Sequence, residues 1–335
     1  MPDDAKNDPN GLRALADGVR QSNRRAIARA ITLVESHRDE DLDAASDLLG
    51  FLGSDTRKPA LRLGISGVPG VGKSTFLEAF GSYLLRRGLR VAVLAIDPSS
   101  TVSGGSVLGD KTRMATLASS DQAFVRPTPG AGASGGISPR TREAMAVLEA
   151  ANFDVVLVET IGVGQSETAI HDLVDYLLLL VLTGAGDELQ GIKRGVLELA
   201  NGIAVTKADR DNRERAESAA RELRSALKIL HAARPAGPAT VFTCSALENL
   251  GIAEIWSELE QGHRERVESG ALEQLRRDQG VLWYERRVQE EAIRRWLQDP
   301  RFQRAFEAQR QAVADGRTTP FAAARATFGS SEPER

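Results

Sequence analysis

The first residues that could do chemistry are the glycines, the lysine and the serine of one short loop. The loop reads Gly67-Val68-Pro69-Gly70-Val71-Gly72-Lys73-Ser74, which fits G-x-x-x-x-G-K-[ST]. It follows an apolar run and precedes a helical pattern, as a phosphate-binding loop must. Its glycines let backbone N–H groups turn inward around an anion, and the helix directs its positive end at the same place. The loop therefore predicts a nucleotide phosphate site.

Side chains in and after this loop have separate expected roles. We expect Lys73 to bridge the β- and γ-phosphates and the Ser74 hydroxyl to take one Mg²⁺ position. Thr75, the next residue, is also expected to contact the nucleotide. A chance match to the motif in a glycine-rich chain is the alternative, and the strand–loop–helix context argues against it.

Two carboxylates end the apolar runs that follow the loop. Asp97 ends the second run and predicts a Mg²⁺ contact, with a helix or turn cap as the alternative. Glu159 ends the third run, where Asp is usual, and it reaches one methylene further. That length favours a water-mediated Mg²⁺ contact or a role in orienting the attacking water. Gly162 can give a backbone N–H to the γ-phosphate.

A third pattern concerns the base. In Thr206-Lys207-Ala208-Asp209, the aspartate can accept both N1–H and N2–H of guanine, and the Lys207 stem packs along the base. Backbone N–H groups of Ser245, Ala246 and Leu247, after the next strand, can meet guanine O6. Asn is usual where Thr206 stands, and Thr206 keeps only a shorter hydroxyl. The pattern predicts GTP rather than ATP.

The elements that position these residues are short apolar runs separated by helical stretches. The runs are 61–66, 91–96, 155–158, 176–182, 203–205 and 240–242. Such alternation predicts an α/β fold with a mostly parallel, doubly wound sheet, of the P-loop NTPase kind. Ligands of such sheets bind at the carboxyl ends of the strands, where the residues above lie.

The chain divides into three expected parts. Residues 1–58 form an N-terminal helical extension with a polar break at 21–23, residues 59–260 form the P-loop domain, and residues 261–335 form a C-terminal helical arm. In the arm, apolar residues recur at helical spacing (Val281, Tyr284, Val288, Ala292 and Trp296). This stripe exposes more apolar surface than one helix can hide, so it predicts a homodimer.

Composition excludes several classes of protein. Lys and Arg total 43 against 46 Asp and Glu, a net charge of −3, so a nucleic-acid or membrane partner is not expected. The single cysteine, Cys244, rules out an internal disulfide. Acidic residues near the start and the short apolar runs argue against a targeting peptide or a membrane span. A soluble, cytoplasmic protein is expected.

Beyond the phosphate loop, long blocks of sequence resemble the MeaB/ArgK family of P-loop GTPases. They are Asp97–Ser100, Ser103–Met114, Glu159–Glu167 and Gly186–Gly195, and the likeness covers nearly the whole chain. Members of that family act as chaperones of adenosylcobalamin-dependent acyl-CoA mutases. The resemblance implies GTP hydrolysis that gates cofactor loading, protection and reactivation of a mutase such as methylmalonyl-CoA mutase. The adenosylcobalamin belongs to that client.

The resemblance also implies roles for three segments. Residues 98–114 would be a first switch, with Asp110 joining Asp97 near the metal, and residues 161–167 a second. Residues 183–195 would be a third switch facing the mutase, from which Lys193 could swing toward the phosphates. The C-terminal helices would form the homodimer.

The alternative functions are a metal-delivery GTPase, a P-loop kinase and a targeting GTPase. A metal-delivery GTPase needs Cys and His ligands, and the one cysteine and four scattered histidines argue against it. A P-loop kinase needs an acceptor site and a base that are not visible. A targeting GTPase that binds hydrophobic signals is disfavoured by the presence of only three methionines.

Overall fold

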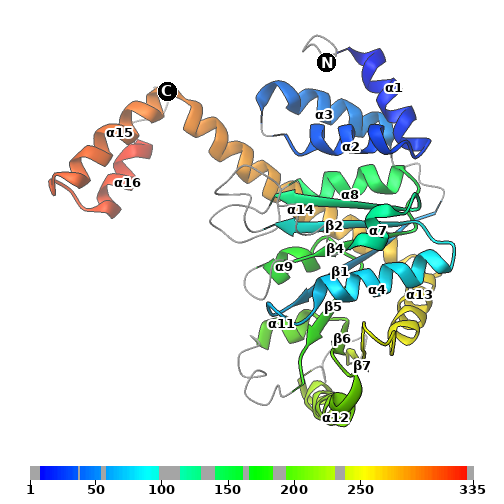
Figure 1. Ribbon diagram of the computed structural model, residues 1–335. Coiled ribbons are helices and arrows are strands. Elements are labelled where there is room, and N and C mark those ends of the chain that lie inside the picture. The colour runs from blue at the N-terminus through cyan, green and yellow to red at the C-terminus, as the bar shows by residue number, and fades with distance from the viewer. Residues whose placement is uncertain are drawn as a thin grey trace. The chain divides into compact units, whose positions relative to one another are not determined.

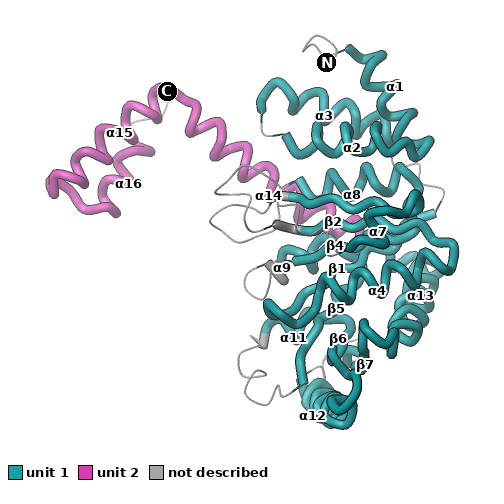
Figure 2. The backbone as a smooth tube through the Cα atoms, in the orientation of Figure 1, with its two compact units in different colours: residues 1–275 teal, residues 276–335 magenta. Residues whose placement is uncertain are grey.

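The computed structural model describes residues 8–36, 38–53, 58–97, 114–129, 140–160, 166–183, 194–230 and 238–329 of the 335-residue chain. The chain divides into two compact units, residues 1–275 and 276–335 (Figure 2). The phosphate loop and the base-recognition pattern both lie in the first unit.

A parallel sheet forms the centre of the first unit (Figure 1). Its strands are β1 (Leu61–Gly67), β2 (Val91–Asp97), β3 (Ala123–Pro129), β4 (Val155–Glu159), β5 (Tyr176–Val181), β6 (Gly202–Val205) and β7 (Thr240–Thr243). Their order is β3-β2-β4-β1-β5-β6-β7, and every pairing is parallel. All six predicted runs are strands, so the predicted fold class is confirmed.

The seventh strand, β3, was not predicted. It contains Pro127 and Pro129, which cannot donate to a sheet ladder and which weaken the strand pattern in the sequence. The structure places β3 at an edge, where it pairs with β2 alone. An edge strand tolerates proline, because one of its sides carries no ladder.

Helices cover both faces of the sheet. They are α4 (Lys73–Arg86), α7 (Ala115–Ser119), α8 (Thr141–Ala150), α9 (Ser166–His171), α11 (Arg194–Leu199), α12 (Arg213–Leu230) and α13 (Ile252–Glu268). Alternate β1 residues such as Leu63 and Ile65 share a core with α4 and α13. Gly64 points the other way, and a Cβ there would lie 2.7 Å from Ile170 of α9. This double covering explains why β1 is buried throughout.

The N-terminal helices are α1 (Pro9–Arg20), α2 (Arg24–Val34) and α3 (Asp39–Leu52), as the helical pattern predicted. Asp8 and Asn23 cap α1 and α2 through their side-chain oxygens. Arg126 of β3 donates to Glu35 at 2.6 Å, and Arg90 donates to Ser22 at 2.6 Å. These contacts attach the extension to the sheet.

The second unit contains most of α14 (Ala271–Gln298), together with α15 (Pro300–Ala314) and α16 (Pro320–Gly329). Trp296 packs edge-on against Phe302 and Phe328, with ring centroids 5.6 and 5.5 Å apart. Val281, Tyr284 and Val288 of the predicted stripe stay exposed. None of the helices that the structure describes is long and apolar enough to cross a bilayer.

Candidate nucleotide site

The phosphate loop lies between the central strand β1 and α4. Val68, Pro69 and Gly70 form its turn, which the Val71 N–H closes by donating to the Val68 carbonyl at 3.2 Å. At Gly67 a Cβ would lie only 2.6 Å from the Leu180 carbonyl oxygen, so a side chain would force β1 and β5 apart. Glycine at position 67 is therefore required by the close approach of β5.

Gly72 begins the helix. It is the N-cap of α4 at φ 99°, a left-handed conformation that favours glycine. Residues Phe76, Phe80 and Leu84 then bury one face of α4 at spacings of four. This packing fixes the helix so that its first N–H groups point toward the loop, as anion binding requires.

Lys73 and Ser74 lie in the first turn of α4. The Lys73 side chain folds back, and Nζ donates to the Gly67 carbonyl oxygen at 2.8 Å. The residue is only 8% exposed, so its ammonium is held at the loop. Ser74 Oγ donates to Oε1 of Glu159 at 3.3 Å. Helix α4 and strand β4 thus bring a hydroxyl and a carboxylate together.

The oxygen pair formed by Ser74 and Glu159 fits Mg²⁺, which prefers carboxylate and hydroxyl oxygens and keeps several waters. Asp97 ends β2 two residues beyond Ala95, the residue that pairs with Glu159. Its backbone therefore lies at the same edge of the sheet. No group of three or more Asp, Glu, His or Cys side chains with ligand geometry occurs among the residues with described positions.

A cavity of about 170 Å³ opens beside the loop, and three distant segments line it. The segments are the start of α4 (Val71, Gly72, Thr75 and Phe76), the end of β6 (Thr206, Lys207 and Asp209), and the turn after β7 (Cys244, Ala246 and Leu247). The structure therefore brings the predicted phosphate and base residues to one place.

Asp209 presents the carboxylate of this cavity. It precedes the short 3₁₀ helix η3 (Arg210–Asn212), yet its side chain makes no capping hydrogen bond. The oxygens are thus available to a ligand with two adjacent donors. Guanine has such a pair in N1–H and N2–H, and adenine does not.

Lys207 has a left-handed backbone, φ 58°, which is uncommon for a residue with a side chain. Asn212 Nδ2 donates to the Lys207 carbonyl oxygen at 2.7 Å and to Thr183 Oγ1 at 2.9 Å. Sequence reasoning missed Asn212, because no motif marks a residue five positions after the lysine. It fixes the segment that carries Asp209.

The residues of the turn after β7 differ in their contacts. Ser245 is fully buried, its N–H donates to the Leu250 carbonyl oxygen at 3.0 Å, and its hydroxyl accepts from the Glu248 N–H at 3.2 Å. It shapes the turn and does not line the cavity, unlike Ala246 and Leu247. Cys244 also lines the cavity, and burial raises the pKa of its thiol to about 12, so the thiol stays neutral.

Several predicted residues lie outside the described part of the chain. They are Asp110, Gly162 and Lys193, with most of the three expected switch segments. Asp97 is placed by its backbone alone.

Comparison with known proteins identifies the family. Residues 27–301 match the family model described as "Methylmalonyl Co-A mutase-associated GTPase MeaB". The chain belongs to the MeaB family of GTPases.

MeaB-family relatives are similar over most of their length. A probable GTPase of Mycobacterium tuberculosis is 46% identical over 321 residues, covering 96% of this chain and 95% of that protein. The GTPase ArgK of Escherichia coli is 45% identical, covering 90% of this chain and 91% of ArgK. The mouse methylmalonic aciduria type A homolog is 39% identical, covering 92% and 77%. The chain is accordingly a GTPase.

A solved structure agrees with this assignment. The crystal structure titled LAO/AO transport system kinase superposes with a TM-score of 0.72 at 38% identity, covering 95% of this chain and 96% of that one. The P-loop fold inferred from the sequence is therefore also the fold of a related protein.

Proposed function

We propose that this MeaB-family member is a GTP-hydrolysing chaperone that gates adenosylcobalamin loading, protection and reactivation of an acyl-CoA mutase. The observation that carries the proposal is the family match over residues 27–301, whose description names association with methylmalonyl-CoA mutase. A relative named for methylmalonic aciduria supports the same client chemistry. The proposal includes a cytoplasmic homodimer.

In this proposal the described residues hold the nucleotide at both ends. Lys73 exchanges its bond to the Gly67 carbonyl for the β- and γ-phosphates, a charge-assisted contact. The Asp209 carboxylate accepts hydrogen bonds from N1–H and N2–H of guanine. Ser74, Glu159 and Asp97 would hold Mg²⁺, with Asp110 as a further candidate, and the ion would neutralise charge on the phosphates. Gly162 contributes a backbone donor to the γ-phosphate.

Hydrolysis without the client is expected to be slow. The motif set contains no arginine finger, and GTPases that lack one await a partner for full activity. Lys193, on the proposed third switch, supplies the cation when the mutase docks. A charge placed correctly in the transition state accounts for at least a tenfold change in rate, about 1.4 kcal/mol of barrier.

The test is single-turnover GTP hydrolysis with and without a panel of apo acyl-CoA mutases. The correct mutase is expected to raise the rate at least tenfold, and Lys193→Ala is expected to reduce the stimulated rate. Lys58→Ala, a change at an exposed lysine outside the motifs, serves as the matched control. If no mutase stimulates the wild type, the chaperone proposal is wrong.

A further inference from the structure

We propose that Thr206 is a positioning residue that fastens the phosphate loop to the end of β6, and that it does not read the base. Thr206 stands where Asn is usual in this motif. The role of its side chain therefore has to be derived from the contacts that it makes in this chain. The inference rests on the assignment of the 170 Å³ cavity as the guanine pocket.

Thr206 lines the cavity, but its hydrogen bonds go to the protein's own carbonyl oxygens. The residue is 5% exposed, and its backbone N–H donates to the Val181 carbonyl oxygen at 2.8 Å, which extends the β5–β6 pairing. Its Oγ1 lies 2.9 Å from the Val71 carbonyl oxygen and 3.2 Å from that of Val181. One side chain therefore connects the phosphate loop, β5 and β6.

The chemistry of a hydroxyl decides what else Thr206 can do. A hydroxyl carries one proton, and here two carbonyl oxygens compete for it. Guanine O6 is an acceptor, so the Thr206 hydroxyl has no remaining proton to offer it. An asparagine amide has two N–H donors and could serve both tasks. In this chain, base reading is left to Asp209 and to backbone N–H groups near Ala246 and Leu247.

The tether acts on the whole nucleotide. Val71 is fully buried and precedes Gly72 and Lys73, so its carbonyl fixes the part of the loop where α4 begins. The same residue lines the base cavity. Loss of the tether loosens the loop against the strand end for every nucleotide that occupies it, whichever base the nucleotide carries.

The experiment measures dissociation constants for GDP, IDP and ADP by displacement of a fluorescent GDP analogue from the full-length protein. Thr206→Val keeps the shape of the side chain and removes the hydroxyl. It is expected to weaken the binding of all three nucleotides by the same factor, roughly 3- to 30-fold, which is the usual effect of losing one buried hydrogen bond. The GDP-to-ADP and GDP-to-IDP ratios are expected to stay at their wild-type values.

Conservative and control variants separate the tether from a general packing effect. Thr206→Ser retains the donor and is expected to restore GDP affinity to within about threefold of wild type, below the weakening expected for loss of the bond. Thr243→Val makes the same change on β7, at a hydroxyl with no hydrogen bond in the described chain, and is expected to leave all affinities unchanged. If Thr206→Val does not fold, Thr206→Cys, with its weak S–H donor, takes its place with the same expectation.

Distinct results would overturn distinct claims. A loss shared by GDP and IDP, which both carry O6, with ADP unaffected, would show that Thr206 reads the base. Unchanged affinity for all three nucleotides in Thr206→Val would show that the tether has no role in binding. Failure of the wild type to bind GDP would reject the pocket assignment, and the tether with it.

Discussion

At the scale of single residues, base recognition in this chain depends on the carboxylate of Asp209. It lines the cavity and makes no capping bond of its own. Asp209→Asn removes two charge-assisted hydrogen bonds at about 1.5–3 kcal/mol each, so GDP affinity is expected to fall at least a hundredfold. Xanthosine diphosphate should then bind better than GDP. Calorimetric titration of both nucleotides measures the switch.

The nearby residue Asp211 provides a control for the change at Asp209. Asp211→Asn removes an exposed carboxylate two residues away and is expected to leave GDP binding intact. Wild-type protein should bind GDP at least a hundredfold tighter than ADP. Equal affinities for GDP and ADP would show that Asp209 does not select the base.

Motif spacing predicted which residues meet at the site, and it did so without any knowledge of packing. Lys73, Ser74, Glu159 and Asp209 could be selected because each lies at or shortly after the end of a parallel strand, and those ends share one edge. The partner of Thr206 could not be predicted. Its bond to Val71 spans 135 residues and depends on how β6 lies beside the loop.

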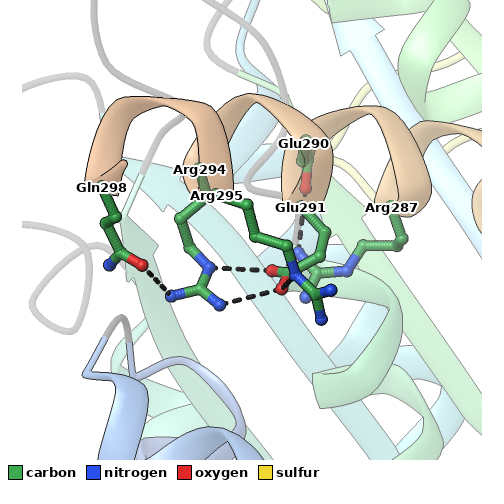
Figure 3. Close-up of polar contacts among 6 residues, drawn as sticks. All are labelled: Arg287, Glu290, Glu291, Arg294, Arg295 and Gln298. Carbon is green, nitrogen blue, oxygen red and sulfur yellow. Dashed lines mark hydrogen bonds and ion pairs between the residues drawn. The ribbon is translucent and has the colours of Figure 1, made fainter. Parts of the chain in front are cut away.

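At the scale of elements, α14 carries a cluster of ion pairs between side chains three and four residues apart (Figure 3). Arg294 donates twice to Glu291 at 2.8 Å, and Arg295 donates to the same carboxylate at 2.7 Å. These bonds lower the pKa of Glu291 to about 2. The contribution of the cluster to helix stability is therefore present above the ordinary pKa of 4.5 and lost as the pH falls toward 2.

The titration of Glu291 can be followed by NMR of its side-chain carboxyl carbon. A midpoint near 2 is expected in the wild type, and Arg294→Gln with Arg295→Gln should raise it toward 4.5. Arg301→Gln on α15 serves as a control for the loss of a positive charge. A wild-type midpoint at 4.5 would mean that the three side chains do not hold this geometry in solution.

Helices and strands could be predicted from the sequence where a local pattern of apolar residues marks them. The six apolar strands and the N-terminal helices follow from periodicity, because each buries a continuous run or one stripe. Strand β3 did not follow, since Pro127 and Pro129 are acceptable only at a sheet edge. The position of β3 at an edge depends on the order of all the strands in the sheet, so it cannot be predicted from the seven residues of β3 alone.

At the scale of the whole molecule, the first three residues of the predicted stripe on α14 remain largely exposed. Val281, Tyr284 and Val288 are 57%, 68% and 48% exposed. Trp296 differs, because Phe302 and Phe328 of the same unit pack against it. Large apolar side chains grouped on one helix face are typical of an interface between subunits.

We therefore expect a homodimer with a twofold interface built on this stripe, since most homodimers pair the same surface patch of both subunits. Tyr284→Glu combined with Val288→Glu places two charges on each subunit at positions that are exposed in the single chain, so folding should be unaffected. Light scattering at micromolar concentration is expected to give a dimer for the wild type and a monomer for the double variant. The monomer should still bind GDP, because the nucleotide cavity lies wholly within residues 1–275.

Gln289→Glu adds a charge at a neighbouring exposed position and should leave the dimer intact. A wild-type monomer under these conditions would mean that the stripe serves another contact.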